Sequence, residues 1–398
     1  MTQYLLSVII PTKNRGDYVQ KVLKQMLKYN FSDMQIVIQD NSDKDVLKHF
    51  IDTIPDKMNI KYNNTGHQIS FVENFNIAVS MADGQYLCLI GDDDCVLPNI
   101  IHIARWAKSK NVKAVTPKLN AIYFWPDSAS LTRYKKNDGV LFLDDFSFNI
   151  MQISTKKQLI KLLTRGAYNY LNLNLGKLYH GMVDRSVIQK IKDKTGSYFG
   201  GLSPDIYMSV SISLQVESVV YLDFPFTISG ICQKSGSADS ASGRHTGDYK
   251  SIPHLKGHSE YDWALEVPKF YSVETIWADS ALAAFKDLHA NEMKRYFNAK
   301  ALSVKCFLKY PKYRYLCYSH YKKIYSKRLI SSIIFFSLVL LFGTLSIIKK
   351  FTKKIFKIII NKTQVYKDIS SIEKATIIVN DQIKKRKRDK NSFFKLDQ

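Results

Sequence analysis

The chain is organised around Gly84-Gln85-Tyr86-Leu87-Cys88-Leu89-Ile90-Gly91-Asp92-Asp93-Asp94-Cys95-Val96-Leu97-Pro98. Its apolar run, Tyr86 to Ile90, predicts a buried strand between turns. Three acids, Asp92 to Asp94, follow almost directly. A buried parallel strand delivers the residues after it to the carboxyl edge of the sheet, where open α/β folds bind ligands.

Three adjacent carboxylates repel one another unless a positive group lies among them. Mg²⁺ and Mn²⁺ prefer oxygen ligands and are usually held by one or two carboxylates together with substrate phosphates. The acids are therefore candidate ligands for Mn²⁺ or Mg²⁺. The alternative is a solvated acidic turn, and the rest of the N-terminal half favours the metal site.

The N-terminal half alternates predicted strands and helices, with acids after the second and fourth strands, at Asp40 and at Asp92–Asp94. Pro11 is expected to end the first strand and to open a polar loop, Pro11–Gly16, at its carboxyl end. This order predicts an α/β fold with parallel strands and a nucleotide site at the carboxyl edge. The predicted strands are Leu5–Ile10, Met34–Gln39, Ile60–Tyr62 and Tyr86–Ile90, and two predicted helices are Asp17–Tyr29 and Ser70–Met81.

Short motifs follow one another in a fixed order over residues 1–120. They are Val8–Arg15, Val37–Ser42, Asn76, Ala82, Gly84–Tyr86, Asp92–Asp94 and Pro98. This ordered set resembles glycosyltransferase family 2, the inverting enzymes with the GT-A fold. The resemblance implies a GT-A-like nucleotide-sugar-binding fold with a mixed, mostly parallel sheet.

The resemblance also implies roles for individual residues. The residues that would bind the donor are Pro11, Thr12, Asn14, Arg15, Asp40, Asn76, Asp92 and Asp93. Asp92 and Asp94 would form the Asp-x-Asp motif that binds ribose and metal, and Asp93 is close enough to replace either. Many relatives carry an acid where this chain has Gly91, so the two acids that touch the metal stay open. The implied cofactor, Mn²⁺ or Mg²⁺, would act as a Lewis acid on the leaving nucleoside diphosphate.

An inverting transfer also needs a general base near the acceptor hydroxyl. In Gly200–Met208, Ser203 is a predicted N-cap and Pro204 the first helical residue, so Asp205 falls in the first turn. Related glycosyltransferases carry their catalytic acid at a similar Pro-Asp, and the resemblance therefore implies Asp205 as the base. The alternative is an acid that only stabilises the helix N-terminus; the glycines before the turn, expected to be flexible, favour catalysis.

The second half of the body carries weaker signals. Ser229–Gly247 is rich in glycine and serine and predicts a long mobile loop, interpreted as a lid over the donor. His180 is a minor candidate for the acceptor pocket, and the histidines at 245, 254 and 258 are minor candidates for a metal site. Apolar residues at helical spacing predict a helical subdomain over 259–325.

The charge is uneven along the chain. The whole chain carries +23; residues 291–398 hold 26 Lys and Arg against 6 acids, whereas residues 1–290 hold 32 against 29. Leu329–Ile348 is a run of 20 uncharged residues, enough for a helix about 30 Å long. Lysine or arginine flanks both of its ends, so the positive-inside rule gives no orientation. An in-plane or re-entrant helix avoids placing the body and the basic tail on opposite sides of the membrane.

Two basic segments follow this run. In Lys349–Ile359 the lysines fall within about 140° of helical arc, the pattern of an interfacial helix on anionic lipid. Lys384–Arg388 would add an electrostatic anchor, although such a cluster can also bind nucleic acid. Beside a hydrophobic segment, lipid is the preferred partner, and no nucleic-acid partner is expected.

These observations predict three parts: a GT-A-like domain over 1–235, a lid loop and helical subdomain over 236–325, and membrane-associating helices over 326–398. Five cysteines without a Cys-x-x-Cys pair and the absence of a signal-peptide pattern favour the cytoplasmic face of the membrane. The expected activity is transfer from a UDP-linked sugar to a membrane- or lipid-linked saccharide. The alternatives are a nucleotidyltransferase, which the lack of a glycine-rich loop near the first strand disfavours, and an inactive binding or scaffold protein.

Overall fold

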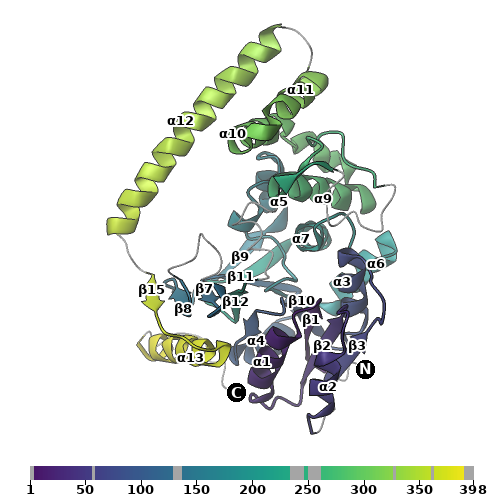
Figure 1. Ribbon diagram of the computed structural model, residues 1–398, viewed down its shortest axis with the longest axis vertical. Helices are drawn as coiled ribbons and strands as arrows, with labels where there is room; N and C mark the ends of the chain where they lie inside the picture. Colours follow the sequence, from purple (N-terminus) through teal and green to yellow (C-terminus); the bar gives the residue numbers. More distant parts are fainter. Residues whose placement is uncertain are drawn as a thin grey trace.

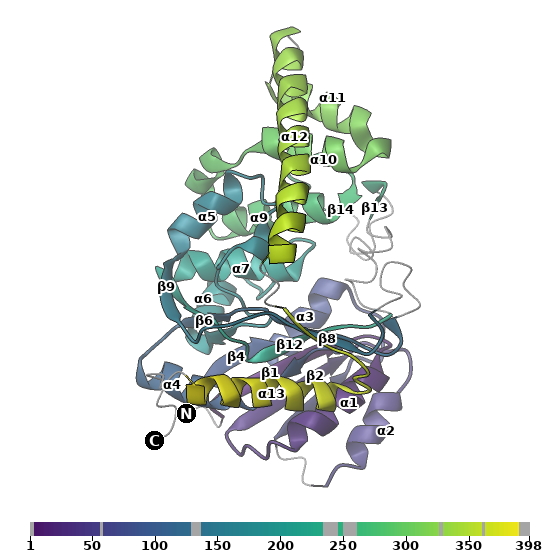
Figure 2. The same cartoon turned by 90° about the vertical axis from the view of Figure 1, so that its left-hand side faces the viewer.

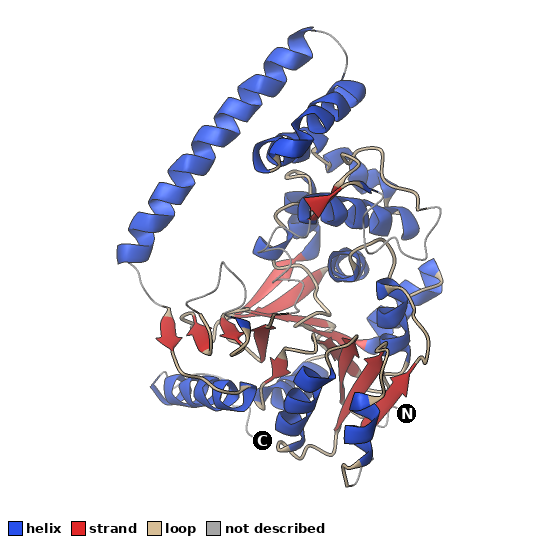
Figure 3. Ribbon diagram, in the orientation of Figure 1, coloured by secondary structure: helices blue, strands red, loops and turns tan. Residues whose placement is uncertain are grey.

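The computed structural model describes residues 4–55, 59–128, 137–233, 246–249, 261–325, 329–359 and 363–389. Two β-sheets lie in the centre of the body with helices packed on both faces, and one long helix, α12, runs along an outer edge (Figures 1 and 3). This architecture confirms the predicted α/β class with a mixed sheet.

The main sheet has eight strands in the order β3-β2-β1-β4-β10-β6-β11-β9. The pairs among β3, β2, β1 and β4 are parallel, as is β11 with β6, whereas β10 and β9 run antiparallel to their neighbours. The strands are β1 Leu6–Thr12, β2 Met34–Asp40, β3 Ile60–Asn64, β4 Tyr86–Leu89, β6 Ala114–Pro117, β9 Ile150–Ser154, β10 Met182–Asp184 and β11 Ser218–Leu222. The predicted order of alternating strands and helices up to β4 is confirmed.

The end of the first strand differs from the prediction. Pro11 does not break the strand: β1 continues to Thr12, with Pro11 opposite Gln39 of β2. The pairing of β1 with β4 stops at Ile9 and Leu89, so beyond that point β1 has one neighbour. The missing N–H of Pro11 is tolerated because one edge of the strand no longer has a partner there.

Residues of β1 alternate between two hydrophobic cores. Val8 and Ile10 pack with α1 (Gly16–Leu27) and α4 (Asn99–Ser109), whereas Ile9 faces α3 (Phe71–Ser80) and α6 (Arg185–Thr195). Both faces are buried, which accounts for the continuous apolar run in the sequence. Helix α2 (Val46–Asp52) covers the start of α1.

A second sheet has the order β15-β8-β7-β12-β5. Its strands are β5 Cys95–Val96, β7 Ala121–Phe124, β8 Val140–Leu143, β12 Thr227–Ile231 and β15 Gln364–Tyr366. The aromatic residues of β7 and the residue after it are buried: Tyr123 is fully covered, and Phe124 and Trp125 are 6% and 2% exposed. The predicted lid begins inside β12, so Ser229 to Ile231 are strand residues; most of the rest, and the histidines at 245, 254 and 258, lie outside the described residues.

The upper part of the molecule in Figure 1 is helical. Helices α7 and α9 pack on each other around a third core, and α10 and α11 lie beyond them. A short two-stranded sheet, β13 with β14, stands beside them. The elements are α5 Thr155–Leu163, α7 Pro204–Gln215, α9 Val273–Asp287, α10 Ala299–Lys309, α11 Arg314–Tyr325, β13 Thr246–Gly247 and β14 Tyr271–Ser272.

The last elements leave the body and return to it. Helix α12 (Leu329–Ile359) contacts α10 and α11, and β15 then pairs with β8. Helix α13 (Ile372–Asp389) places Ile372, Ala375 and Val379 in the same core as β1 and α1. Figure 2 shows α12 and α13 on the side of the molecule that faces the viewer. The predicted boundary at 326 stays a prediction, but the chain after it contributes to the core of the N-terminal body.

Within the described ranges, no helix combines the length and the apolar character needed to cross a membrane. All five cysteines are buried, and none of them forms a disulfide bond.

Candidate active site

The three acids lie in the turn between β4 and β5 and are almost completely buried, at 0%, 4% and 2% exposure for Asp92, Asp93 and Asp94. They do not form the solvated turn of the alternative interpretation. Buried carboxylates need partners. The partners come from three different parts of the chain.

The loop after β1 supplies the partners of Asp92. The Thr12 hydroxyl donates to Asp92 Oδ2 at 2.8 Å, and Arg15 Nε donates to the same oxygen at 2.8 Å. Arg15 Nη2 lies 2.5 Å from Asp92 Oδ1, although this oxygen receives no aligned hydrogen bond. The first and fourth strands thus meet at one edge, with Thr12 and Arg15 in direct contact with the acids.

Asp94 is held by the protein on both oxygens. Oδ1 accepts the Gly230 N–H at 2.7 Å; Oδ2 accepts the Gly91 N–H at 2.7 Å and the Tyr179 hydroxyl at 2.8 Å. His180 Nε2 lies 3.2 Å from Oδ2. Burial alone raises the pKa of Asp94, but His180 and the two backbone N–H groups outweigh it and keep that pKa below its ordinary value.

Asp93 is the least paired of the three. Its Oδ2 accepts the Cys232 N–H at 3.2 Å, and its Oδ1 lies 3.9 Å from Arg15 Nη1. Burial and the neighbouring charge of Asp94 raise the pKa of Asp93 to about 7, against the opposing effect of Arg15.

Position 91 has little room for a side chain. A Cβ atom at Gly91 would lie 2.7 Å from the Tyr179 hydroxyl and 2.8 Å from Asp94 Oδ2. A larger residue would therefore displace the Tyr179–Asp94 contact. Glycine at position 91 therefore permits the hydrogen bond between Tyr179 and Asp94.

Three other predicted donor residues, Pro11, Asn14 and Asp40, lie in or just after the first two strands. Asn14, with a left-handed φ of 56°, links the loops after β1 and β2 through Asp43 and Ser42. Asp40 is buried and accepts hydrogen bonds from the Ser42 N–H and the Tyr62 hydroxyl. Pro11 is a buried residue of β1. These residues border the same sheet edge without touching the acids.

Asn76, a predicted donor residue, is hydrogen-bonded to other parts of the protein. Its amide nitrogen donates to the carbonyls of Val72 and Phe199, and its oxygen accepts the N–H groups of Tyr198 and Phe199. Both donors and both acceptor positions are therefore used within the protein. Asn76 fixes the segment that leads into the Gly200–Asp205 turn, and its contact with the donor stays a prediction.

The helix that carries Asp205 begins as predicted, with Ser203 as N-cap and Pro204 first. The Ser203 hydroxyl, however, does not cap the helix; it donates to Asp205 Oδ1 at 2.5 Å. The turn is fixed from α9, because Ser280 Oγ accepts the N–H groups of Leu202 and Ser203 at 3.0 and 2.9 Å. Gly201, at φ +63°, packs against Ser280, so its lack of a side chain permits this close contact.

A buried lysine lies beside Asp205. Burial lowers the pKa of Lys177 to about 8, while the charge of Asp205 opposes that shift. Burial raises the pKa of Asp205, and the Ser203 hydroxyl and Lys177 counteract it. Lys177 is three residues before His180, so one short segment carries groups that act on Asp205 and groups that hold Asp94.

Sequence reasoning missed most of the residues that hold the acids. Tyr179 sits in a segment with no periodic pattern, and His180 was given only a minor role, in an acceptor pocket. Trp125 Nε1 donates to the Asp93 carbonyl at 3.0 Å. Gly230 did carry a signal: an isolated glycine in a strand pattern marks a close backbone approach, and a Cβ there would lie 1.8 Å from that carbonyl.

The oxygens that the protein leaves without close partners decide which acids can hold a metal ion. Asp92 Oδ1 and Asp93 Oδ1 are oxygen donors on adjacent residues, which suits Mg²⁺ or Mn²⁺ with phosphate and water as further ligands. Asp94 is already saturated by protein groups. Among the described residues no cluster of three or more His, Cys, Asp or Glu is arranged to hold a metal ion. The fit is thus to a two-carboxylate site at Asp92 and Asp93.

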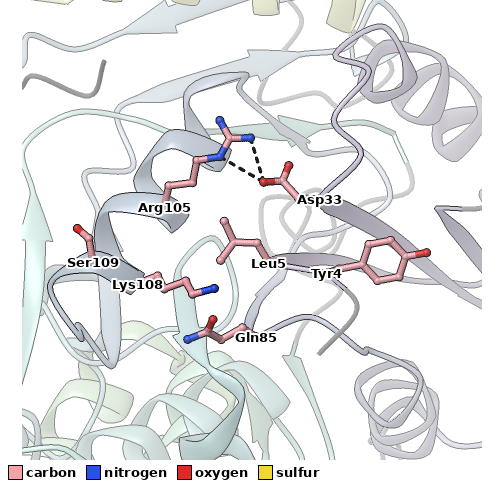
Figure 4. A pocket seen from close by; sticks show the side chains of 7 residues that line it. All are labelled: Tyr4, Leu5, Asp33, Gln85, Arg105, Lys108 and Ser109. Carbon is pink, nitrogen blue, oxygen red and sulfur yellow. Dashed lines mark hydrogen bonds and ion pairs between the residues drawn. The ribbon is translucent and has the colours of Figure 1, made fainter. Parts of the chain in front are cut away.

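A separate pocket of about 570 Å³ lies at the amino ends of the strands, near the starts of β1, β2 and β4 (Figure 4). Arg105 and Asp33 form an ion pair on its wall, with Nη2–Oδ2 at 2.9 Å. Its position at the opposite edge of the sheet separates it from the acids. Its lining residues are Tyr4, Leu5, Asp33, Gln85, Arg105, Lys108 and Ser109.

Comparison with known proteins concerns the part of the chain that carries the three acids. Residues 7–148 match the sequence model of the family described as Glycosyl transferase family 2. This part of the chain is similar in sequence to glycosyltransferase family 2. The match covers the loop after β1, the three acids and the strands between them.

Two curated relatives match a segment of similar length. The abequosyltransferase RfbV of Salmonella typhimurium is 32% identical over 104 residues, which are 25% of this chain and 31% of that protein. The GalNAc(5)-diNAcBac-PP-undecaprenol beta-1,3-glucosyltransferase of Campylobacter jejuni is 31% identical over 94 residues, 23% of this chain and 30% of that protein. The aligned part thus spans about a third of each relative.

A crystal structure of S. aureus TarS 1–349 in complex with UDP-GlcNAc is similar over 80% of this chain and 89% of that chain, with 12% identity. The TM-score is 0.46, and nothing about function follows from a similarity of this level.

Proposed function

We propose that this protein is a metal-dependent, inverting glycosyltransferase that moves a sugar from a nucleotide-sugar to a membrane- or lipid-linked saccharide. The observation that carries the proposal is the contact of Thr12 and Arg15 with Asp92 inside the part of the chain that matches family 2. It joins the loop expected to bind the nucleotide to the acids expected to bind ribose and metal.

In this proposal Asp92 and Asp93 are the metal ligands. Asp94, which was also predicted to bind metal, instead holds the turn in place through Tyr179, His180, Gly91 and Gly230. When bound, Mn²⁺ or Mg²⁺ would supply Lewis-acid stabilisation of the leaving diphosphate. Arg15 adds a cation that can contact the same diphosphate.

Asp205 is the proposed general base. As the acceptor hydroxyl attacks the anomeric carbon, its proton passes to the Asp205 carboxylate and the bond from that carbon to the phosphate oxygen breaks. The nucleoside diphosphate leaves with the electron pair, and the anomeric configuration inverts. Lys177 is a positioning residue, because its charge favours the ionised form of Asp205 that accepts a proton.

The donor and acceptor classes follow from the family resemblance and from the name of one relative. The family resemblance favours a UDP-linked sugar. A lipid-linked acceptor is supported by the name of the Campylobacter relative, which specifies an undecaprenol-linked substrate for that protein. The cytoplasmic face of the membrane, where nucleotide-sugars are available, is the proposed location.

The test is a screen of nucleotide-sugars for transfer or slow hydrolysis, with Mn²⁺, with Mg²⁺ and with a chelator. Release of nucleoside diphosphate that requires the metal and is lost in Asp205→Asn supports the proposal. A chain that binds nucleotide-sugars but releases nothing with any donor or lipid-linked acceptor would instead be the inactive binding protein. An enzyme that forms a nucleotide-sugar from a nucleoside triphosphate would be the nucleotidyltransferase.

A further inference from the structure

Helix α12 exposes a broad apolar face. Helical geometry of about 100° per residue places its exposed large side chains within roughly 180° of arc. Their exposed fractions reach 77% at Leu329 and 70% at Leu340. The exposed residues are Leu329, Ile333, Ile334, Phe336, Leu340, Leu341, Leu345 and Ile348.

The opposite face of α12 is occupied by protein. Phe335 is fully buried against Phe307 of α10 and Tyr321 of α11, with ring centroids 5.3 and 4.7 Å away. The Tyr318 hydroxyl hydrogen-bonds to Ser332 at 2.7 Å. The side of α12 that packs on the body is therefore satisfied, and the apolar face points away from it.

One hydroxyl on the exposed face is hydrogen-bonded to the helix backbone. Thr344, which lies within the apolar arc, donates its hydroxyl to the carbonyls of Leu340 and Leu341 at 3.0 and 2.9 Å. This arrangement hides a hydroxyl from an apolar environment. No charged residue occurs between Leu329 and Ile348.

We infer that α12 lies in the plane of a bilayer that contains anionic lipid, with this apolar face in the hydrocarbon boundary and the body on one side only. The inference deepens the membrane part of the proposed function and rests on it. Charge complementarity selects the occupant: Lys327, Arg328, Lys349 and Lys350 flank the apolar run, and Lys384 and Lys385 are exposed on α13. Figures 1 and 2 show α13 and α12 along the same side of the molecule.

The path of the chain excludes a single crossing. The first half of α12 is packed on α10 and α11, and β15 is paired with β8 of the body. From Ile359 to Gln364 the chain can reach at most about 18 Å, which is shorter than the roughly 30 Å of a hydrocarbon core. Both ends of the helix are therefore tied to the same folded body and lie on the same side of the membrane.

A second copy of the chain is less suited than a membrane to cover the apolar face of α12. Both ends of the apolar run carry two basic residues, so a parallel and an antiparallel pairing of two α12 helices both bring like charges together. Anionic headgroups, in contrast, neutralise both ends at once.

The test is flotation of the full-length protein with vesicles of phosphatidylcholine, with and without phosphatidylglycerol, in the absence of donor and acceptor. Ile333→Glu/Leu340→Glu should weaken binding to the mixed vesicles by about 100-fold, because two apolar side chains leave the hydrocarbon boundary. Leu171→Glu/Leu265→Glu changes two leucines that are 64% and 81% exposed outside α12 and should leave binding unchanged. Equal loss in both pairs, or no binding by the wild type, would overturn the inference.

Depth measurements distinguish an α12 helix that lies in the plane of the membrane from one that crosses it. All five native cysteines are buried, so bimane attached to Leu329→Cys, Leu340→Cys or Ile348→Cys reports single positions. Quenching by lipids with a nitroxide at a shallow or a deep carbon should give one shallow depth for all three. A deeper position for residue 340 than for both ends would establish a crossing helix and refute the in-plane arrangement. Dimers in solution that no longer bind vesicles would identify a second copy as the occupant and also refute it. Because no sugar substrate is present, these results are independent of the proposed transfer activity.

Discussion

The guanidinium of Arg15 and the carboxylate of Asp92 face each other at two points, with Nε–Oδ2 at 2.8 Å and Nη2–Oδ1 at 2.5 Å. The pair is largely shielded from water, and Arg15 reaches towards Asp93 as well. A protein cation therefore occupies the space that a divalent ion would share with the same carboxylates. In the proposed metal complex, the metal and Arg15 would therefore compete for the same negative charges.

This competition predicts that Arg15 suppresses the binding of metal alone. Arg15→Gln should raise the affinity for Mn²⁺ in the absence of nucleotide by about tenfold or more, because a nearby unit charge repels the divalent ion. Free Mn²⁺ measured by electron paramagnetic resonance in a titration gives this affinity. Arg105→Gln is the matched control, since Arg105 pairs with Asp33 at the other edge of the sheet. An unchanged affinity in Arg15→Gln would show that the arginine does not oppose the metal.

Asp93 and Asp94 should respond differently to the same substitution. Asp94→Asn should lower the free energy of unfolding by about 2–4 kcal/mol, because it loses a buried carboxylate that accepts hydrogen bonds on both oxygens. Asp93→Asn should change that free energy by less than about 1 kcal/mol but should abolish metal-dependent nucleotide binding. Urea unfolding and calorimetric titration on both variants measure the two effects. The assignment of roles fails if Asp94→Asn folds normally and alone loses the metal.

Asp205→Asn tests the general base. Loss of the base should reduce turnover by about 10²–10⁴-fold, while donor and metal binding persist. A carboxylate that only stabilises the helix N-terminus predicts at most about 1 kcal/mol of lost stability and near-normal turnover. Turnover and melting temperature measured on one sample distinguish these outcomes. Lys177→Met provides a second readout: without the lysine charge the pKa of Asp205 rises, so the acid limb of kcat/KM should move to higher pH.

Asp279 of α9 predicts a pH dependence of stability. Burial raises the pKa of this carboxyl to about 7, against hydrogen bonds from the Tyr261 hydroxyl and the Ala264 N–H. The folded state therefore holds a proton that the unfolded state releases near pH 4, so stability falls as the pH rises from about 4 to 7 and then levels off. Each unit of pKa difference corresponds to about 1.4 kcal/mol. Asp279→Asn should flatten this decline and raise the melting temperature at pH 8 more than at pH 5; a parallel shift at both values would contradict it.

Deletion of residues 364–398 should destabilise the N-terminal body. It removes β15 from the edge of a sheet and takes Ile372, Ala375 and Val379 out of the core that contains β1 and α1. The two larger side chains alone correspond to a loss of about 3 kcal/mol or more. Thermal unfolding of the deleted chain, compared with a chain that ends after residue 389 and so keeps α13, measures the effect. Equal melting temperatures would mean that this end of the chain is dispensable for folding.

The sequence by itself determined the first four strands, their order and the edge at which the acids lie. This was possible because continuous apolar runs, helical periodicity and terminal polar loops are local patterns, and the carboxyl ends of parallel strands must share an edge. It also indicated Asp205 in the first turn of a helix, since Ser-Pro-Asp is a local signal.

Only the tertiary structure decided how the acids are neutralised. Tyr179, His180 and Gly230 reach Asp94 from segments 85 to 136 residues away, and no local pattern encodes such contacts. The same holds for Asn76, whose amide turns out to fix the turn before Asp205, and for α13, whose basic residues gave no hint that its other face completes the core of β1. A short-range pattern specifies what a segment can form, whereas its partners depend on which surfaces remain to be buried once every element has packed.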